Sequence, residues 1–185
     1  MEIIKTELND CFIIEPDVFG DHRGYFMQTH SEKDLIDNGL KYHFVQGNES
    51  FTKEKGTIRG LHFQIDPMCQ AKLVRVTNGA VYDVVVDLRT DSSTYKKWIK
   101  VELSNENKRQ LLVPRGFAHG FVTLTKDVVF SYMVDNFYSK EHDGGIIYND
   151  SELNVDWEIE NPIMSQKDER LPRLREIDNQ FRRNR

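Results

Sequence analysis

The chain has 185 residues, of which 38% are hydrophobic and 30% charged, and its formal net charge is −5. These totals predict one soluble domain over residues 1–185, ending in a charged arm from about residue 170. The acidic balance argues against nucleic acid as a partner, because affinity for a phosphate backbone comes from massed Lys and Arg. No stretch has the roughly 18 apolar residues of a membrane span. The first residues lack the pattern of a signal peptide, and two cysteines are too few for a disulfide framework, so we expect a cytoplasmic protein.

The first predicted element is a helix at residues 31–39, with Ser31 as its N-cap and Gly39 near its end. Short strand-like runs then follow at intervals of about ten residues, separated by turn residues such as those at 78–79 and 114–116. This spacing favours an antiparallel sandwich or barrel. The runs lie at residues 57–65, 72–77, 80–88, 98–103, 110–114, 120–125 and 128–134.

The run at residues 57–65 carries a histidine among apolar neighbours. Because side chains alternate between the two faces of a strand, His62 is expected to share a face with Ile58, Gly60 and Gln64. A histidine in such a place is a packed core residue, a metal ligand or a base.

Two further strands place a reactive side chain among apolar ones. The Asn78-Gly79 pair predicts a two-residue hairpin, whose register sets Lys72 and Asp83 on a diagonal of one face. Tyr132 likewise lies on the apolar face of its strand. Together with the histidine, these side chains suggest one lined pocket.

A metal site is the first chemistry to weigh. Pro114, Gly116 and His119 have the P-x-G-x-x-H spacing of cupin barrels. A metal-binding cupin also needs an H-x-H pair followed by a carboxylate on an earlier strand, but the matching segment here has His62 and then Gln64. Two imidazoles without a carboxylate make a poor site, so no metal is expected.

Acid–base chemistry remains, because neither cysteine lies in a recognisable nucleophilic setting and no G-x-S-x-G motif occurs. Histidine is the usual general base near neutral pH, and tyrosine can return a proton from the opposite side. Lysine can stabilise a developing enolate by its charge. Taken singly, each side chain also has a structural explanation: a satisfied core histidine, a snorkelling lysine and a packed tyrosine.

Several longer motifs occur in a fixed order along the chain. They read GTIRGLHFQ, QAKLVRVTNGAVYDVVVDLR and VPRGFAHGF, supported by DHRGYF, FVQGNES, SYMVDNFYSKEHDGGI and SQKDERLP. With these motifs the sequence resembles the dTDP-4-dehydrorhamnose 3,5-epimerase family from about residue 3 to 175. The resemblance implies a mainly β, cupin-type antiparallel barrel (jelly roll) with short peripheral helices. It also implies a homodimer that needs no cofactor and acts on a nucleotide-linked 4-keto-6-deoxy sugar at C3 and C5.

The resemblance also implies roles for individual residues. His62 would remove the proton, Asp168 would orient that histidine, Tyr132 would return a proton on the other face, and Lys72 would stabilise the enolate. Asp83 is expected to support His62 or Lys72. The residues expected to bind the substrate are Arg23, Gln28, Gln46, Asn48, Arg59, His119, Tyr138, Asp143 and Lys167.

The departures from the family pattern gather in the ligand-recognition segments. Gln28 stands where the family commonly has glutamate. An amide can donate as well as accept a hydrogen bond, so it could also serve cytosine. The alternative substrate is therefore a CDP-linked or other nucleotide-linked 4-keto sugar. A single-centre epimerase, at C3 or C5, also stays open, because nothing in the sequence sets the number of centres inverted. A ketoisomerase or a binding module on the same barrel is a further alternative. The complete set of His62, Tyr132 and Asp168 argues against a pure binder, and Gln64 stands where a ketoisomerase would be expected to carry an additional histidine.

Overall fold

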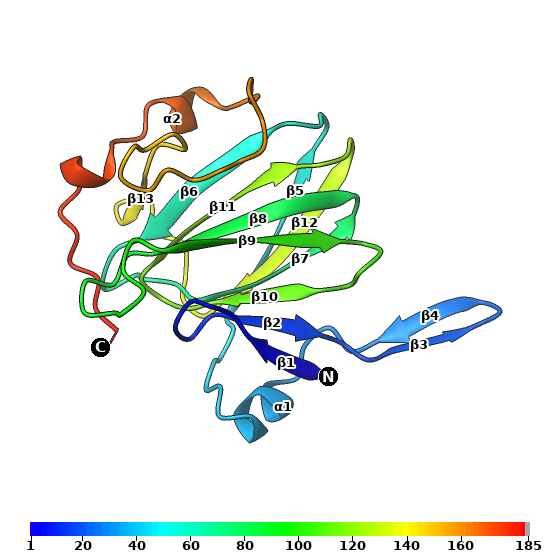
Figure 1. Cartoon of the computed structure of the whole chain (residues 1–185). Helices are drawn as coiled ribbons and strands as arrows, with labels where there is room; N and C mark the ends of the chain where they lie inside the picture. Colours follow the sequence, from blue (N-terminus) through cyan, green and yellow to red (C-terminus); the bar gives the residue numbers. More distant parts are fainter. Residues whose placement is uncertain (184–185) are drawn as a thin grey trace.

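Two antiparallel sheets face each other and enclose the core, as predicted (Figure 1). The computed structural model describes residues 1–183. In spatial order, the six-stranded sheet contains β1 (Glu2–Lys5), β2 (Phe12–Glu15), β10 (Gln110–Val113), β7 (Lys72–Asn78), β12 (Val128–Val134) and β5 (Gln46–Thr52). The five-stranded sheet contains β13 (Asp143–Gly145), β6 (Ile58–Gln64), β11 (Phe117–Thr123), β8 (Ala80–Asp87) and β9 (Trp98–Ser104).

The remaining elements are short. The hairpin of β3 (Val18–Asp21) and β4 (Gly24–Met27) projects from the body of the barrel (Figure 1). The helices are α1 (Glu32–Asp37), α2 (Gln166–Glu169) and the 3-10 helix η1 (Leu174–Glu176). No helix in the part of the chain that the structure describes is long and apolar enough to cross a membrane.

The interior between the sheets is filled by β-branched and aromatic side chains. Val74 on β7, Val81 and Val85 on β8, and Phe130 on β12 are buried in one cluster. Such residues suit a strand because their branched side chains pack well on a pleated surface. Burying each one fully contributes about 1.5–3 kcal/mol. This apolar lining surrounds the few polar groups that reach the interior.

The helix predicted at residues 31–39 is present as α1 (Glu32–Asp37). The Ser31 hydroxyl accepts a hydrogen bond from the Asp34 amide at 3.2 Å, as an N-cap does. Leu35 is 1% exposed and packs with Leu73 and Leu112 on the outer side of the six-stranded sheet. The helix therefore covers that sheet from outside.

The predicted hairpin at Asn78-Gly79 is wrong. β7 and β8 do not pair with each other, because β7 pairs with β10 and β12 whereas β8 pairs with β9 and β11. Gly79 has a φ of 79°, a conformation that favours glycine, and its amide donates to the Asn105 side chain. The turn thus carries the chain from one sheet to the other, so the inward faces of β7 and β8 oppose each other across the core.

The predicted alternation along β6 fails in its first half. His62 pairs with His119 of β11, but Phe121 pairs with Arg59, so β6 carries one extra residue between these pairs. Such a bulge re-aims the side chains on either side of it. As a result Ile58 is buried with Leu61 on the outer face of the five-stranded sheet, and Arg59 reaches the same pocket as His62.

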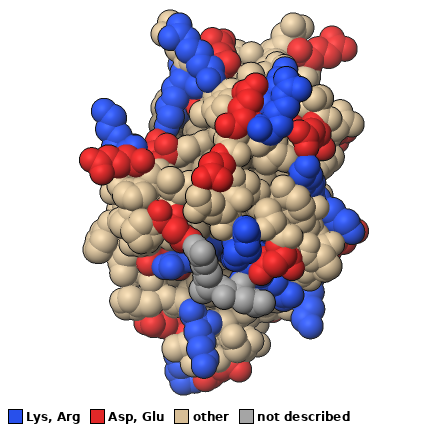
Figure 2. All heavy atoms as spheres, turned by 90° about the vertical axis from the view of Figure 1, so that its left-hand side faces the viewer, with Lys and Arg blue, Asp and Glu red and all other residues tan. Residues whose placement is uncertain are grey.

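The segment after residue 170 packs against the barrel as far as it is described. Phe181 is 5% exposed, and its carbonyl accepts a hydrogen bond from the Thr90 amide at 3.1 Å. Arg183 pairs with Asp10 at 2.7 Å. On the face drawn in Figure 2, Lys and Arg side chains are interspersed with Asp and Glu.

A buried ion network holds the end of β8 to the N-terminal loop. Arg89 is 3% exposed and donates two hydrogen bonds of 2.9 Å to the carboxylate of Asp87, which is fully buried, and one of 2.9 Å to Asp10.

Replacing Arg89 with methionine is expected to lower the free energy of unfolding by about 3–5 kcal/mol, because it leaves a buried carboxylate unpaired. Urea denaturation checks this. The exposed Arg182→Met is the control, and a loss below about 1 kcal/mol for Arg89→Met would contradict the expectation.

Candidate active site

A pocket opens between the two sheets beside α2. It consists of two adjoining cavities of about 290 and 380 Å³, and both are lined by His62, Lys72, Tyr132 and Lys167. These side chains come from β6, β7, β12 and α2, so the pocket depends on both sheets. The structure therefore brings the predicted reactive side chains of three separate strands to one place.

His62 and Asp168 form a hydrogen-bonded pair in this pocket. The His62 Nε2 atom lies 2.7 Å from Asp168 Oδ1, although the two residues are 106 positions apart in the sequence. The Asp168 side chain is 5% exposed and that of His62 is 31% exposed. Burial opposes ionisation of Asp168, but its hydrogen bond with His62 holds the pKa of the carboxyl below its usual value. An ionised Asp168 fixes the tautomer with the proton on Nε2 and leaves Nδ1 as a free base.

The backbone explains why Asp168 is held in place. The Ser165 hydroxyl accepts a hydrogen bond from the Asp168 amide at 3.1 Å and so caps α2. α2 lies over β6, the strand of His62 (Figure 1). The carboxylate is thus fixed by a capped helical turn.

Lys72 and Tyr132 face the same space from the opposite sheet. Burial lowers the pKa of Lys72 to about 8, while the nearby Asp83 charge acts in the other direction. Burial also raises the pKa of Tyr132, and the charge of Asp143 adds to this effect. At neutral pH the pocket therefore offers a largely protonated ammonium group and a protonated phenol.

Asp83 does not bond to His62 or Lys72. Its carboxylate is fully buried and accepts a hydrogen bond from His119 Nε2 at 2.8 Å. Burial lowers the pKa of His119, which favours its neutral form, while the neighbouring Asp83 acts in the other direction. Asp83 acts on Lys72 only through its charge. The expectation from a hairpin diagonal missed His119 because the partner of Asp83 lies on the neighbouring strand β11.

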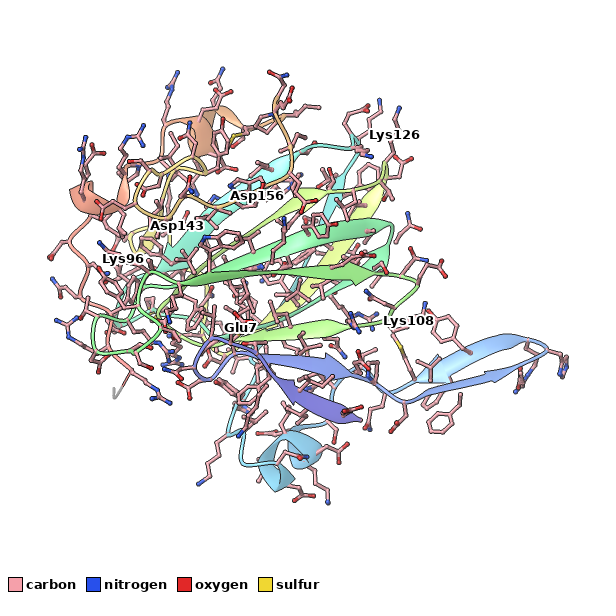
Figure 3. All side chains as sticks on the ribbon, viewed as in Figure 1. Glu7, Lys96, Lys108, Lys126, Asp143 and Asp156 are labelled. Atoms are coloured by element: carbon pink, nitrogen blue, oxygen red, sulfur yellow. The ribbon has the colours of Figure 1, made fainter. Side chains whose placement is uncertain are left out.

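Several of the predicted binding residues lie around the same two cavities. Lys167 Nζ is 2.6 Å from the Asp143 carboxylate, which also accepts a hydrogen bond from the Tyr138 hydroxyl at 3.4 Å. Asp143 lies at β13, on the edge of the five-stranded sheet (Figure 3). The other predicted binding residues that line the cavities are Gln46, Asn48, Arg59 and His119.

Arg23 and Gln28 do not line this pocket. Arg23 lies at the turn of the β3–β4 hairpin, where its side chain is 79% exposed and pairs with Asp21. Gln28 follows β4 directly. The hairpin extends away from the barrel (Figure 3). Near its base, the Nζ atom of Lys108 lies over the Tyr25 ring, 4.2 Å from the ring centroid. Within one chain these two residues are therefore separate from the rest of the predicted binding set.

Sequence reasoning missed Ser50 and Ser165, which line the first cavity. Ser50 could have been found from the period of two along β5, which places it on the same face as Gln46 and Asn48. Ser165 lies just before α2 and had no such pattern.

The residue at the position of the second metal-binding histidine of a cupin, Gln64, bonds to backbone groups of the protein. Within residues 1–183, no group of three or more His, Cys, Asp or Glu side chains is arranged to hold a metal ion. Gln64 donates to the carbonyls of Met68 and Phe137, at 2.6 and 3.1 Å. The donor set of the pocket is suited to moving protons beside a stabilised negative charge.

The protein is a cupin-type jelly-roll barrel whose pocket brings together an imidazole, a phenol and an ammonium group, a set of groups suited to acid–base chemistry. The sequence profile described as dTDP-4-dehydrorhamnose 3,5-epimerase matches residues 5–176. A protein of that name from Shigella flexneri is 49% identical over 169 residues, which cover 91% of this chain and 93% of the relative.

Two solved structures are similar over nearly the whole chain. The Bacillus anthracis epimerase, with TDP and PPi bound, has a TM-score of 0.91 and 50% identity, and the match covers 94% of this chain and 99% of that one. The Legionella pneumophila enzyme in complex with dTDP-4-keto-L-rhamnose has a TM-score of 0.91 and 41% identity, over 96% of this chain and 94% of that one. The chain belongs to the dTDP-4-dehydrorhamnose 3,5-epimerase family.

Proposed function

We propose that the protein is an isomerase that epimerises a nucleotide-linked 4-keto-6-deoxy hexose at C3 and C5. The proposed substrate is dTDP-4-dehydro-6-deoxyglucose and the product dTDP-4-dehydrorhamnose, in agreement with the names of its relatives. The observation that carries the proposal is the His62–Asp168 pair in one pocket with Tyr132 and Lys72. A binding module would need no base facing a proton donor. Nothing in the comparisons favours the CDP-linked or single-centre alternatives.

The reaction is a proton transfer on each side of the ketone. The carbonyl acidifies the adjacent C–H bond, and His62 Nδ1 takes the proton while the electron pair of that bond forms an enolate. The Lys72 ammonium stabilises the negative oxygen by its charge. The Tyr132 hydroxyl then gives a proton to the opposite face of the carbon, and the ketone is restored. Exchange with solvent returns the proton to Tyr132 and removes it from His62, so no redox cofactor takes part.

Binding of the nucleotide portion is assigned to the outer part of the pocket. Arg59 and Lys167 supply positive charge for the diphosphate, and His119 supplies a polar contact deeper inside. Tyr138, whose ring is exposed beside the second cavity, is proposed to stack on the base. Asn48, Gln46 and Asp143 complete the polar lining.

Proton exchange in D2O with dTDP-4-dehydro-6-deoxyglucose, followed by NMR and mass spectrometry, tests the proposal. Deuterium at both C3 and C5 is expected, and deuterium at only one centre would favour a single-centre enzyme. No exchange would overturn the assigned substrate.

Calorimetry with dTDP and CDP tests which nucleotide base the protein prefers. We expect tighter binding of dTDP, and a preference for CDP would support the alternative based on Gln28.

Tyr132→Phe separates the two halves of the reaction. We expect proton removal to continue within about threefold of the wild-type rate, while inversion falls roughly 100-fold because the donor on the opposite face is lost. Deuterium incorporation into recovered substrate measures the first step, and the yield of inverted product measures the second. Undiminished inversion by this variant would show that another group returns the proton.

We also propose that the protein acts as a homodimer in which each β3–β4 hairpin serves the pocket of the other subunit. This arrangement would bring Arg23 and Gln28 to a substrate that they do not reach in their own chain. The exposed rings of Phe19 and Phe26, 65% and 70% accessible, are apolar surface that a second copy would cover.

Mixing two inactive variants tests the shared site. Arg23→Ala and His62→Ala chains, denatured and refolded together, should regain about a quarter of wild-type activity, because half of the dimers are mixed and each has one intact site. Each variant refolded alone is the control. No regain of activity although mixed dimers have formed would contradict a shared site.

The unpaired, buried Cys11 and Cys69 are compatible with the cytoplasmic location that we propose.

A further inference from the structure

The loop between β12 and β13 is held by glutamine side chains from three other segments. Gln70 Nε2 donates to the carbonyl of Asn136 at 2.8 Å, and Gln46 Oε1 accepts from the amide of Tyr138 at 3.1 Å. Gln64, on the strand of His62, bonds the residues on both sides of Tyr138. Every residue from 136 to 139 thus has a backbone group bonded to one of these amides.

Gln64 makes the most complete set of contacts. Its Nε2 atom donates to the carbonyl of Phe137 at 3.1 Å and to that of Met68 at 2.6 Å, and its Oε1 atom accepts from the amide of Ser139 at 2.7 Å. The residue is 4% exposed. Both amide hydrogens are therefore used, and the amide orientation is fixed by the two carbonyls and the one N–H that it faces. Although Gln64 lines the second cavity, it has no donor left for a ligand.

We infer that Gln64 is a positioning residue, which binds the loop backbone on both sides of Tyr138 and so holds that ring beside the second cavity. The inference rests on the proposed function, in which Tyr138 stacks on the nucleotide base. Gln64 acts through the loop and does not touch the reacting atoms.

The physical reason is preorganisation. The Tyr138 side chain is 58% exposed, so few packing contacts fix it, and its hydroxyl has only a long hydrogen bond of 3.4 Å to Asp143. A loop that is already ordered loses less conformational freedom when a ligand binds. Without the bonds on both sides of Tyr138, part of the stacking energy would be used to order the loop. The effect should appear in affinity and leave the chemical step nearly unchanged.

Gln64→Met tests this, because methionine has a similar volume but makes none of the three hydrogen bonds. We expect the Kd for dTDP, measured by calorimetry, to rise roughly tenfold and KM to follow it, with kcat within about threefold of the wild type. Gln180→Met, the same change at an exposed position in the C-terminal segment, is the control and should alter neither value. An unchanged Kd, or a loss confined to kcat, would overturn the inference.

A double-mutant cycle separates positioning from a general loss of structure. Tyr138→Ala alone should raise the Kd for dTDP roughly tenfold, because base stacking is lost. In that background Gln64→Met should raise it less than about twofold further, since there is no ring left to position. A full tenfold loss on top of Tyr138→Ala would mean that Gln64 acts elsewhere, and would overturn the inference.

Hydrogen–deuterium exchange of the free protein gives a readout that does not depend on the substrate. Peptides that contain residues 136–142 should exchange at least about threefold faster in Gln64→Met, while β8 peptides are unchanged. Unchanged exchange in the loop would overturn the inference. If wild-type protein fails to bind dTDP, the proposed function fails, and the exchange result still decides whether Gln64 orders the loop.

A second variant covers the case in which Gln64→Met does not fold. Gln70→Met removes only the bond to Asn136, from a partly exposed position at the same loop. It should give the same pattern with a smaller rise in Kd, roughly threefold. No rise in Kd and no faster exchange of residues 136–142 would contradict the role of the glutamine contacts.

Discussion

His62→Ala is expected to lower the rate of proton exchange at C3 and C5 by about 10³–10⁴-fold, because it removes the general base. The Asp168 carboxylate would remain in place, since Ser165 caps its helical turn independently of the histidine. Binding of dTDP should change less than about threefold, because the base contacts the sugar and not the nucleotide. NMR in D2O measures the exchange, and calorimetry measures the binding.

The matched control is His43→Ala, a histidine on the surface whose ring bonds only Glu32. It should exchange protons at the wild-type rate. Exchange by His62→Ala at the wild-type rate would overturn the assigned mechanism. A parallel loss of dTDP binding and thermal stability would instead show that the variant is misfolded.

Lys72→Met is expected to lower kcat by roughly 10²–10³-fold, since the enolate oxygen loses the cationic side chain that β7 contributes to both cavities. Lys167, the other cation there, is more exposed and is paired with Asp143. The fold should tolerate the change, because methionine retains the unbranched apolar part of the side chain. A kcat within about threefold of the wild type would assign enolate stabilisation to another group.

The pH dependence follows from the same residue. Burial lowers the pKa of Lys72 to about 8, so its charge is present below pH 8 and is lost as the pH rises through that value. The kcat/KM of the wild type should therefore fall above about pH 8, before free lysine side chains titrate. Lys72→Arg keeps its charge, so whatever activity it retains should show no such fall. An alkaline limb that persists in Lys72→Arg would exclude Lys72 as its source.

The strands at residues 72–77, 80–88, 98–103, 110–114 and 128–134 could be predicted because their patterns are local. Apolar β-branched residues, with turn residues between them, favour extended backbone wherever the chain is placed. The period of two then puts Tyr132 on the inward face of its strand without knowledge of its neighbours. The acid–base character of the candidate site also came from residue types, since His62, Lys72 and Tyr132 each lie among apolar side chains.

Sheet pairing is not a local property, and there the sequence misleads. Asn78-Gly79 has the composition of a tight hairpin, but β7 pairs with β10 and β12, and β8 pairs with β9 and β11, so that Val74 and Val85 meet in one core cluster between the sheets. The bulge in β6 depends on its register with β11 and cannot be read from alternation alone. This bulge turns the Arg59 side chain to the face of β6 that carries His62.

The sequence by itself indicated the strands between residues 57 and 134, the candidate reactive side chains and the family to which the chain belongs, but not the strands before residue 57 or β13. The tertiary structure confirmed the contact of Asp168 with His62 that the family resemblance implied. Only the tertiary structure showed that Asp83 meets His119 and that Gln64 meets both neighbours of Tyr138. It also placed Arg23 on a hairpin outside the pocket. The reason is that hydrogen bonds between side chains act over about 3 Å, and such proximity between distant segments arises only when the sheets have packed.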